Sequence, residues 1–235
     1  MLVPDRVLYQ EDFQTPKPLG KEIWHPAQGT QWTVENGVLR GRPSTPEYQA
    51  SHKDHRGLEA RGGFRNCPPD YIARFAVRFL GGVDPEALPS LRRIPSIDLG
   101  HHIGRVEFGL EGARLMADGE TVMVAQDPKF RLEPGRWYEV IAEVRGDEVL
   151  VRMDPGLVLY GKHAAFLRGN HDLAFVGRQE GEVEVDRVTL WSLAPGYQPG
   201  WPKNRMKLPK QEDRPIRQKR PGQIAKEKQE TAGKP

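Results

Sequence analysis

The chain of 235 residues has little of several things on which common architectures depend. Its single cysteine, Cys67, excludes an internal disulfide and a cysteine-based zinc site. Only 37% of the residues are hydrophobic, and no stretch approaches the roughly 20 consecutive apolar residues of a membrane span, so an integral membrane protein is not expected. Long helical patterns are scarce, because 25 Gly and 21 Pro interrupt the chain with turns. These absences favour an all-β protein.

The net charge of +3 is unevenly distributed. Residues 202–235 carry 11 Lys and Arg against 4 Asp and Glu, which leaves a net charge of −4 on residues 1–201. We predict a folded domain over residues 1–201 and a disordered basic tail over residues 202–235, either merely solvated or in contact with anionic surfaces. Because the folded part is mildly acidic, no specific nucleic-acid partner is expected.

The N-terminal residues Met1 to Asp5 contain neither a basic segment nor an apolar segment of the kind found in export signals. The sequence therefore predicts either a cytoplasmic protein or a mature periplasmic or extracellular one whose export signal has been removed.

Alternation of apolar and polar residues predicts most of the strands. It is clear in residues 71–79 and in residues 136–145, from which Gly146-Asp147, a type II′ turn signal, leads back into residues 149–153. A second hairpin is expected to join residues 113–117 to 120–125 through a type I′ turn at Asp118-Gly119. Further strands are expected at 7–13, 32–34, 38–42, 103–108, 157–161, 173–177 and 183–193, and short helices around 86–92 and 164–168.

The last predicted strand changes parity near Asp186-Arg187, which predicts a β-bulge there. The first and last strands are both rich in core-type residues and are expected to pair. About a dozen short strands separated by turns predict a two-sheet antiparallel jelly-roll sandwich.

Several segments carry a resemblance. Residues 9–13 (YQEDF) and 32–41 (WTVENGVLRG), with later matches at 70–79, 136–153 and 186–191, resemble a concanavalin A-like jelly roll. More narrowly, they are similar to the 3-keto-disaccharide hydrolase-type domain family, which is grouped loosely with family 16 glycoside hydrolases. Over residues 6–194, this resemblance implies a two-sheet sandwich, carbohydrate recognition on its concave face, and an exported polysaccharide-processing system as its setting.

One motif departs from the resemblance. Family 16 glucanases carry two carboxylates on one strand face in an E-[IL]-D-x-x-E pattern, as retaining chemistry requires. The nearest string here is Glu182-Val-Glu184-Val-Asp186, which keeps the one-face spacing but not the pattern. We interpret these residues as solvent-facing acids on an amphipathic strand rather than as a catalytic dyad.

The chain has seven histidines, and several stand at predicted strand ends or in adjacent loops. If those loops converge, His55, His102 and His163 are candidates to bind a divalent metal or to supply a general base near pH 7. The alternative is that each of them faces solvent independently.

Arg105 and Glu107 alternate on one face of a predicted strand, and with His102 they form the predicted catalytic group. The predicted substrate-binding residues are Arg74, Arg78, Trp137 and Tyr160, since sugar hydroxyls need charged and polar partners and sugar faces stack on aromatic rings. Trp24 is a further stacking candidate. Trp137 has the alternative of packing on the sandwich, and Trp32 and Trp191 are interpreted as core.

The sequence thus predicts a carbohydrate-active domain, a glycoside hydrolase or lyase acting on a modified sugar such as a 3-keto sugar. The alternative is a non-catalytic carbohydrate-binding or surface-adhesion module. Convergence of the three histidines would favour the enzyme, and an aromatic-lined groove would favour the binding module.

Overall fold

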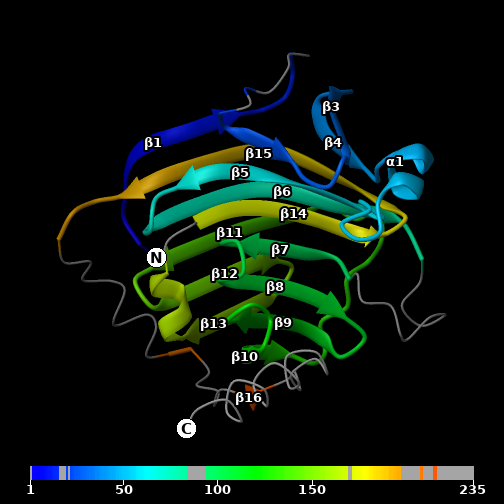
Figure 1. Ribbon diagram of the computed structural model, residues 1–235. Coiled ribbons are helices and arrows are strands. Elements are labelled where there is room, and N and C mark those ends of the chain that lie inside the picture. The colour runs from blue at the N-terminus through cyan, green and yellow to red at the C-terminus, as the bar shows by residue number, and fades with distance from the viewer. Residues whose placement is uncertain are drawn as a thin grey trace, which may run out of the picture.

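Two antiparallel sheets form the fold (Figure 1). The computed structural model describes residues 2–15, 20, 22–83, 94–168, 171–196, 207–208 and 214–215. In this part of the chain, sheet A runs in the order β13 (Leu157–Lys162), β12 (Glu148–Asp154), β11 (Tyr138–Arg145), β6 (Tyr71–Gly81), β15 (Gly181–Leu193), β4 (Val38–Arg42) and β3 (Gln31–Glu35), with β1 (Pro4–Glu11) also paired to β15. Sheet B runs in the order β16 (Arg214–Pro215), β10 (Val122–Asp127), β9 (Gly112–Ala117), β8 (Gly104–Gly109), β7 (Ser96–Leu99), β14 (His171–Gln179), β5 (Glu59–Cys67) and β2 (Trp24–Pro26). The predicted two-sheet antiparallel sandwich is confirmed.

The core lies between the sheets and is built by strand alternation. In β6, the odd-numbered residues from Tyr71 to Phe79 are buried in the core, while Arg74 and Arg78 point outward as predicted. Aromatic rings link the two layers: Phe75 of sheet A meets Phe175 of sheet B with ring centroids 5.0 Å apart. Each sheet therefore has one inner apolar face and one outer face on which polar residues can gather.

The long strand β15 confirms the predicted bulge and the predicted pairing of the chain's first and last strands. Its register against β6 shifts between Asp186 and Thr189, and Arg187 has a φ of 50°. Before the bulge β15 pairs with β4, and after it with β1. One strand thus serves two partners along the same edge, because the bulge redirects it.

The two predicted hairpins differ in outcome. At Gly146-Asp147 the turn has two residues, and the φ of Gly146 is 57°, as a type II′ turn needs. The prediction of a two-residue turn at Asp118-Gly119 was wrong. Glu120 also has a positive φ, of 71°, and β10 begins only at Val122, so the connection has four residues.

Several elements were not predicted. The strands β2, β5, β7 and β16 and the helix α1 (Pro46–Ser51) were missed, whereas the short helix η1 (Ala164–Leu167) confirms one of the two expected. The other, around residues 86–92, lies outside the described residues, as does the predicted basic tail apart from 207–208 and 214–215. None of the described helices is long and apolar enough to cross a membrane.

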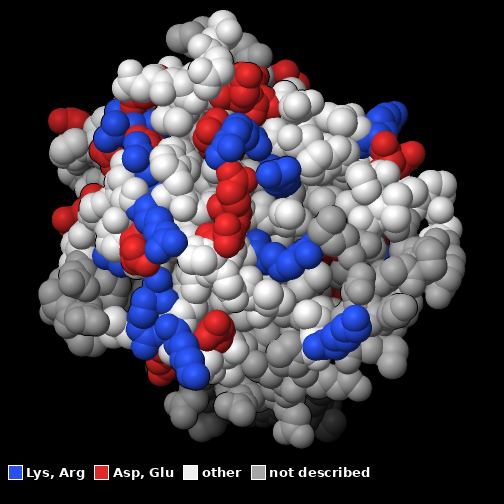
Figure 2. Space-filling view, turned by 180° about the vertical axis from the view of Figure 1, so that it is seen from behind, with Lys and Arg blue, Asp and Glu red and all other residues white. Residues whose placement is uncertain are grey.

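The outer face of sheet A carries arginines and acids in ion pairs. Arg40 contacts Glu182 at 2.5 Å, Arg78 donates to Glu184, and Arg152 donates to Glu143. Figure 2, seen from behind relative to Figure 1, shows charges of both signs side by side. Beside them lies a second apolar cluster made of Leu2, Ile72 and Leu150, with Ile141, Tyr160, Trp191, Leu193 and Leu208 packed against it.

Candidate functional site

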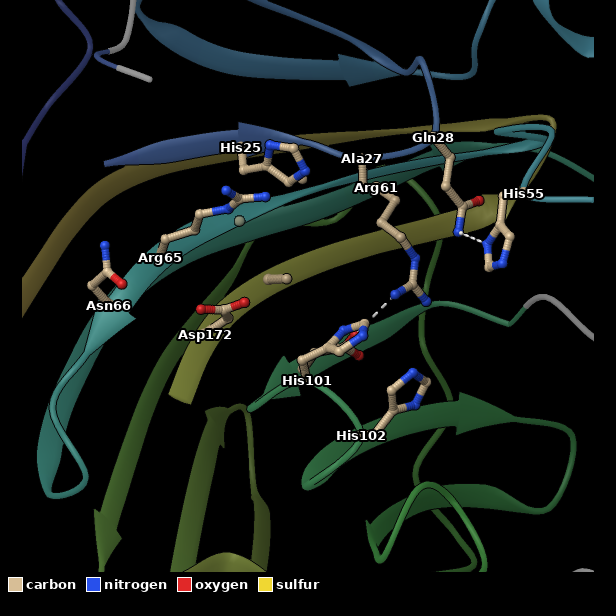
Figure 3. Close-up of a pocket in the computed structure, with 14 residues that line it drawn as sticks. His25, Ala27, Gln28, His55, Arg61, Arg65, Asn66, His101, His102 and Asp172 are labelled. Carbon is tan, nitrogen blue, oxygen red and sulfur yellow. Dashed lines mark hydrogen bonds and ion pairs between the residues drawn. The ribbon is translucent and has the colours of Figure 1, made fainter. Parts of the chain in front are cut away.

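A cavity of about 530 Å³ opens on the outer face of sheet B (Figure 3). Its floor lies where Gly63 of β5 pairs with Ala174 of β14, which in turn pairs with Asp98 of β7. Neither Gly63 nor Ala174 has a side chain large enough to fill the space above the sheet. A Cβ atom added to Gly63 would lie 2.5 Å from the Cβ of Ala174. The hollow therefore follows from two small residues in cross-strand register.

Polar side chains from both sheet and loops surround this floor. They are His25 of β2, Arg61, Arg65 and Asn66 of β5, Asp98 of β7, His101 and His102 of the turn before β8, Asp172 of β14, and Gln28 and His55 of the loops that precede β3 and β5. Gln28 Nε2 and His55 Nδ1 form a hydrogen bond 3.1 Å long. The topology thus gathers four of the chain's seven histidines in one pocket.

The backbone around the pocket is strained. Four of its non-glycine residues have left-handed backbone conformations: Gln28 and His102 with a φ of 57°, His55 with 50° and Asn66 with 60°. Such conformations are uncommon outside glycine and cost free energy, and they cluster at functional sites where the surrounding structure enforces them. Their concentration here marks the pocket as a candidate functional site.

Asp98 is the anchor of an ion-pair network beside the pocket. Its carboxylate accepts from Arg105 Nε at 2.8 Å and Nη2 at 2.9 Å, and from Arg61 Nη1 at 3.3 Å. Burial alone would raise the pKa of Asp98, but the two guanidinium groups outweigh it and the pKa is lowered. Asp98 is therefore a fixed negative charge whose oxygens are already occupied.

The carboxyl group of Asp172 differs from that of Asp98 in its pKa and in its contacts. It is half-buried, and burial raises its pKa, although the Asn66 backbone N–H and the charges of His101, Arg65 and His25 oppose that rise. Among the described residues, no Lys or Arg lies within ion-pair distance of its carboxylate. Asp172 is thus the pocket's one carboxyl group that is free to exchange a proton or to accept from a ligand.

Two of the pocket's histidines resist protonation. Burial lowers the pKa of His25, and nearby Arg65 lowers it further, against the effect of Asp172. Burial also lowers the pKa of His102, with His101 and Arg105 adding to the effect against Glu120 and Asp98. Both imidazoles are therefore available as neutral donors and acceptors at neutral pH.

The predicted catalytic group lies on sheet B, and only His102 lines the pocket. Arg105 is 14% exposed and is held by Asp98 and Glu120. Glu107 accepts from Arg114 Nη2 at 3.1 Å, and burial raises its pKa against the effects of Arg105 and Arg114. The charged groups of Arg105 and Glu107 are thus engaged with the protein itself.

The predicted substrate-binding residues are not near that group. Arg74 and Arg78 lie on β6, and Tyr160 on β13, so all three belong to sheet A. The Arg78 guanidinium lies 4.8 Å from the ring centroid of Trp137, and the Tyr160 hydroxyl donates to Glu148. Because the core separates the outer faces of the two sheets, no single ligand can contact both predicted groups.

The predicted metal triad is not assembled. His55 and His102 both line the pocket, but His163 caps η1, where its Nδ1 accepts from the Ala165 N–H at 3.1 Å. Across the part of the chain that the structure describes, no three His, Cys, Asp or Glu residues are grouped so that they could hold a metal ion. The convergence that would have favoured a metal site is therefore missing.

Three further interpretations need correction. Trp24 is 4% exposed and packs in the core against Phe64, so it is not a surface for sugar stacking. Glu184 was expected to face solvent but is 3% exposed and paired with Arg78. Trp32 packs against the core as predicted, whereas Trp191 packs in the apolar cluster on the outer face of sheet A.

Most of the pocket was not predicted from the sequence, because the strand β5, which carries several of its residues, was not predicted. Residues 59–67 do alternate, with Ala60, Gly62 and Phe64 facing inward and Arg61 and Arg65 outward, but the two central glycines obscure the pattern. The one available signal was that a Gly-Gly pair inside a strand leaves room above the sheet.

These observations define a two-sheet jelly-roll-type sandwich with a polar pocket on one outer face. The chain matches no protein-family model and no curated protein. Among the solved structures that resemble it, an endo-acting O-glycanase of the human gut microbiota that initiates mucin breakdown has a TM-score of 0.53 at 12% identity, covering 80% of this chain and 100% of its own.

Two further similar structures match through part of a larger chain. A sialidase has a TM-score of 0.51 at 14% identity, over 78% of this chain and 18% of its own. The GH43 protein BlXynB of Bacillus licheniformis has a TM-score of 0.50 at 11% identity, over 78% of this chain and 39% of its own. Identities this low establish the shared fold.

Proposed function

We propose that this protein binds carbohydrate in the pocket on sheet B. The observation that carries the proposal is the hollow itself, a polar-walled cavity over a floor of Gly63 and Ala174. Sugar hydroxyls both donate and accept, and they need both kinds of partner. Asp172 offers an acceptor, Arg65 and Asn66 offer donors, and the neutral imidazoles offer either.

The fold comparisons support this proposal. A glycanase, a sialidase and a GH43 protein, each glycan-related by its description, share the sandwich. A glycan ligand also fits the exported alternative of the two locations that the sequence leaves open. The apolar cluster and closed ion pairs on sheet A offer a sugar less than the pocket does.

Binding without turnover is the form of this function that the geometry favours. Hydrolysis by two carboxylates needs one as acid and a second as nucleophile or base. Both Asp98 and Asp172 line the pocket, but the oxygens of Asp98 are occupied by Arg105 and Arg61. One carboxyl group remains.

A glycoside hydrolase or lyase is the second candidate, and the raised pKa of Asp172 favours it. Burial raises the pKa of Asp172, as a general acid that holds its proton near neutral pH requires. In this version Asp172 holds the proton and the neutral imidazole of His102 accepts one. A modified sugar, such as a 3-keto sugar, would be the substrate.

The test fills the cavity. Ala174→Leu places an isobutyl group above the floor, and we expect glycan binding, measured on arrays and by calorimetry, to fall at least tenfold. Val7→Leu is the matched control, since Val7 is 47% exposed on β1 of the other sheet. Equal binding by Ala174→Leu and the parent would rule out the pocket as the binding site.

Asp172→Asn separates the two candidates. A binding module keeps measurable affinity and shows no product with or without the substitution. An enzyme releases reducing ends or an unsaturated sugar, and loses that activity in Asp172→Asn while still binding. Product release by the parent protein would establish the second candidate.

A further inference from the structure

We propose that the ligand of the sheet B pocket is an acidic carbohydrate, whose carboxylate or sulfate binds beside Arg65. This inference rests on the proposed carbohydrate function and names the class of sugar. It is carried by an arginine at the edge of the cavity to which the described residues supply no acidic partner.

Several arginines on the outer faces of this sandwich are neutralised by acids. Arg61 and Arg105 share Asp98, and Arg114 contacts Glu107 at 3.1 Å. On sheet A, Arg40 is paired with Glu182 at 2.5 Å. The sequence thus supplies acids opposite arginines in the cross-strand positions where pairs form.

Arg65, which lines the pocket, is not neutralised in this way. It follows Arg61 and Gly63 on the outer face of β5 and is exposed at the pocket. Within the described ranges, no carboxylate lies within ion-pair distance of its guanidinium, and Asp172 acts on it only at longer range. A guanidinium is a planar fork of donors that matches a carboxylate or a sulfate, so an anionic group of the ligand would supply the missing partner.

The surroundings of Arg65 extend the anion site. Figure 3 shows its guanidinium beside the imidazole of His25, above Asp172, with His101 across the cavity. Burial lowers the pKa of His25, and the charge of Arg65 lowers it further because a second cation beside a guanidinium is unfavourable. An anion bound at this end would be contacted by Arg65 and would relieve the repulsion between Arg65 and a protonated His25.

Substitution of Asp172 should change the affinity for acidic and for neutral sugars in different directions. A neutral sugar would use this carboxylate as a hydroxyl acceptor, so Asp172→Asn would weaken the binding of that sugar or leave it unchanged. An anion beside Arg65 is repelled by Asp172 whenever the carboxylate is ionised. Asp172→Asn should therefore tighten the binding of an acidic sugar several-fold while not tightening that of its neutral counterpart.

The experiment is calorimetry on the full chain at about 0.15 M salt, where long-range attraction to the basic tail is screened. The probes are matched pairs that differ only in the anion: trigalacturonate and its trimethyl ester, sialyllactose and its methyl ester, and galactose 6-sulfate and galactose. The first two pairs test a carboxylate, and the third tests a sulfate. We expect the acidic member of at least one pair to bind at least tenfold more tightly than its neutral partner.

Arg65→Gln should remove that preference, with a loss of about tenfold or more in affinity for the acidic sugar alone. Arg131→Gln is the matched control. Arg131 is exposed, and among the described residues it donates only to the Pro128 and Phe130 carbonyls, so Arg131→Gln removes the same charge away from the pocket.

Failure of the inference and failure of the proposed function look different. Neutral sugars that bind as tightly as acidic ones, and lose affinity in Ala174→Leu, would leave the proposed function standing and overturn the acidic ligand. An acidic preference that survives Arg65→Gln would assign it to the tail or another surface and would also overturn the inference. Absence of binding across all pairs and arrays would remove the proposed function, and the inference with it.

Discussion

The outer faces of the two sheets carry the same kinds of charged residue but differ in how completely those charges are paired. On sheet A, Glu184 and Glu143 are nearly buried beneath the arginines that they neutralise. On sheet B, the Asp98 network is neutralised in the same way, but next to it lie the hollow, the uncompensated Arg65 and the protonatable Asp172. A face that closes its own charges is stable by itself, whereas one that leaves them open beside a cavity is arranged for a ligand.

The largest expected effect on stability comes from removing the carboxylate at the centre of the Asp98 ion-pair network. Asp98→Ala would leave Arg105 and Arg61, which are 14% and 13% exposed, as poorly solvated charges without their shared carboxylate. We expect the free energy of unfolding, from urea denaturation, to fall by about 3–5 kcal/mol. Because the pKa of Asp98 is lowered in the folded protein, its contribution to stability is present above the unfolded pKa and is lost as pH falls through the folded one. A loss below about 1 kcal/mol would mean that the network is only a surface feature.

The contrast between the two faces also separates what the sequence could reveal from what it could not. Strands with strict alternation, such as β6, β11 and β12, and the bulge of β15 were predictable because one face of each is buried in the core. The strands that carry the site were not, since β5 has two glycines at its centre and β7 is buried on both faces.

The pocket itself could not be predicted from local sequence patterns. Its members meet through cross-strand register, with His25 opposite Gly63, Gly63 opposite Ala174, and Ala174 opposite Asp98. Those residues are scattered from position 25 to position 174, and their spacing in the sequence does not predict their order across the sheet. Of the three histidines that were expected to converge, His55 and His102 line the pocket, whereas His163 caps η1.

A somewhat smaller effect is expected from altering the floor. Gly63→Ala would place a Cβ 2.5 Å from the Cβ of Ala174 and 2.7 Å from its Cα, and backbone cannot move aside as a side-chain end can. We expect a loss of about 1–3 kcal/mol in unfolding free energy. Gly109→Ala on β8 is the control, because its nearest contact is the end of Ile94 at 3.4 Å. Similar stability for both variants would show that the floor is not tightly packed.

Asp172→Asn should act in the opposite direction and raise stability at pH 7 by about 0.5–1 kcal/mol. The pKa of Asp172 is raised in the folded protein, so the carboxyl group costs stability above its unfolded pKa. The gain should disappear near pH 3, where the carboxyl group is protonated in both states. His25 and His102, whose pKa values are lowered, reduce stability as pH falls below 6.5 in both proteins, and the His25 effect should be larger in the variant, which lacks the opposing charge of Asp172. A variant less stable than the parent at pH 7 would contradict the strained character of this site.

The smallest effect is expected on the closed face. Arg74 is 60% exposed and lies 3.8 Å from Glu139, which is 38% exposed and also contacts Arg187. Exposed pairs of this kind contribute little because water and salt screen them, so Arg74→Ala should change the unfolding free energy by about 0.2 kcal/mol. Glycan affinity should not change either, if the pocket on sheet B alone holds the ligand. Loss of binding in Arg74→Ala, measured by the same calorimetry, would return the site to sheet A, where the sequence first placed its substrate-binding residues.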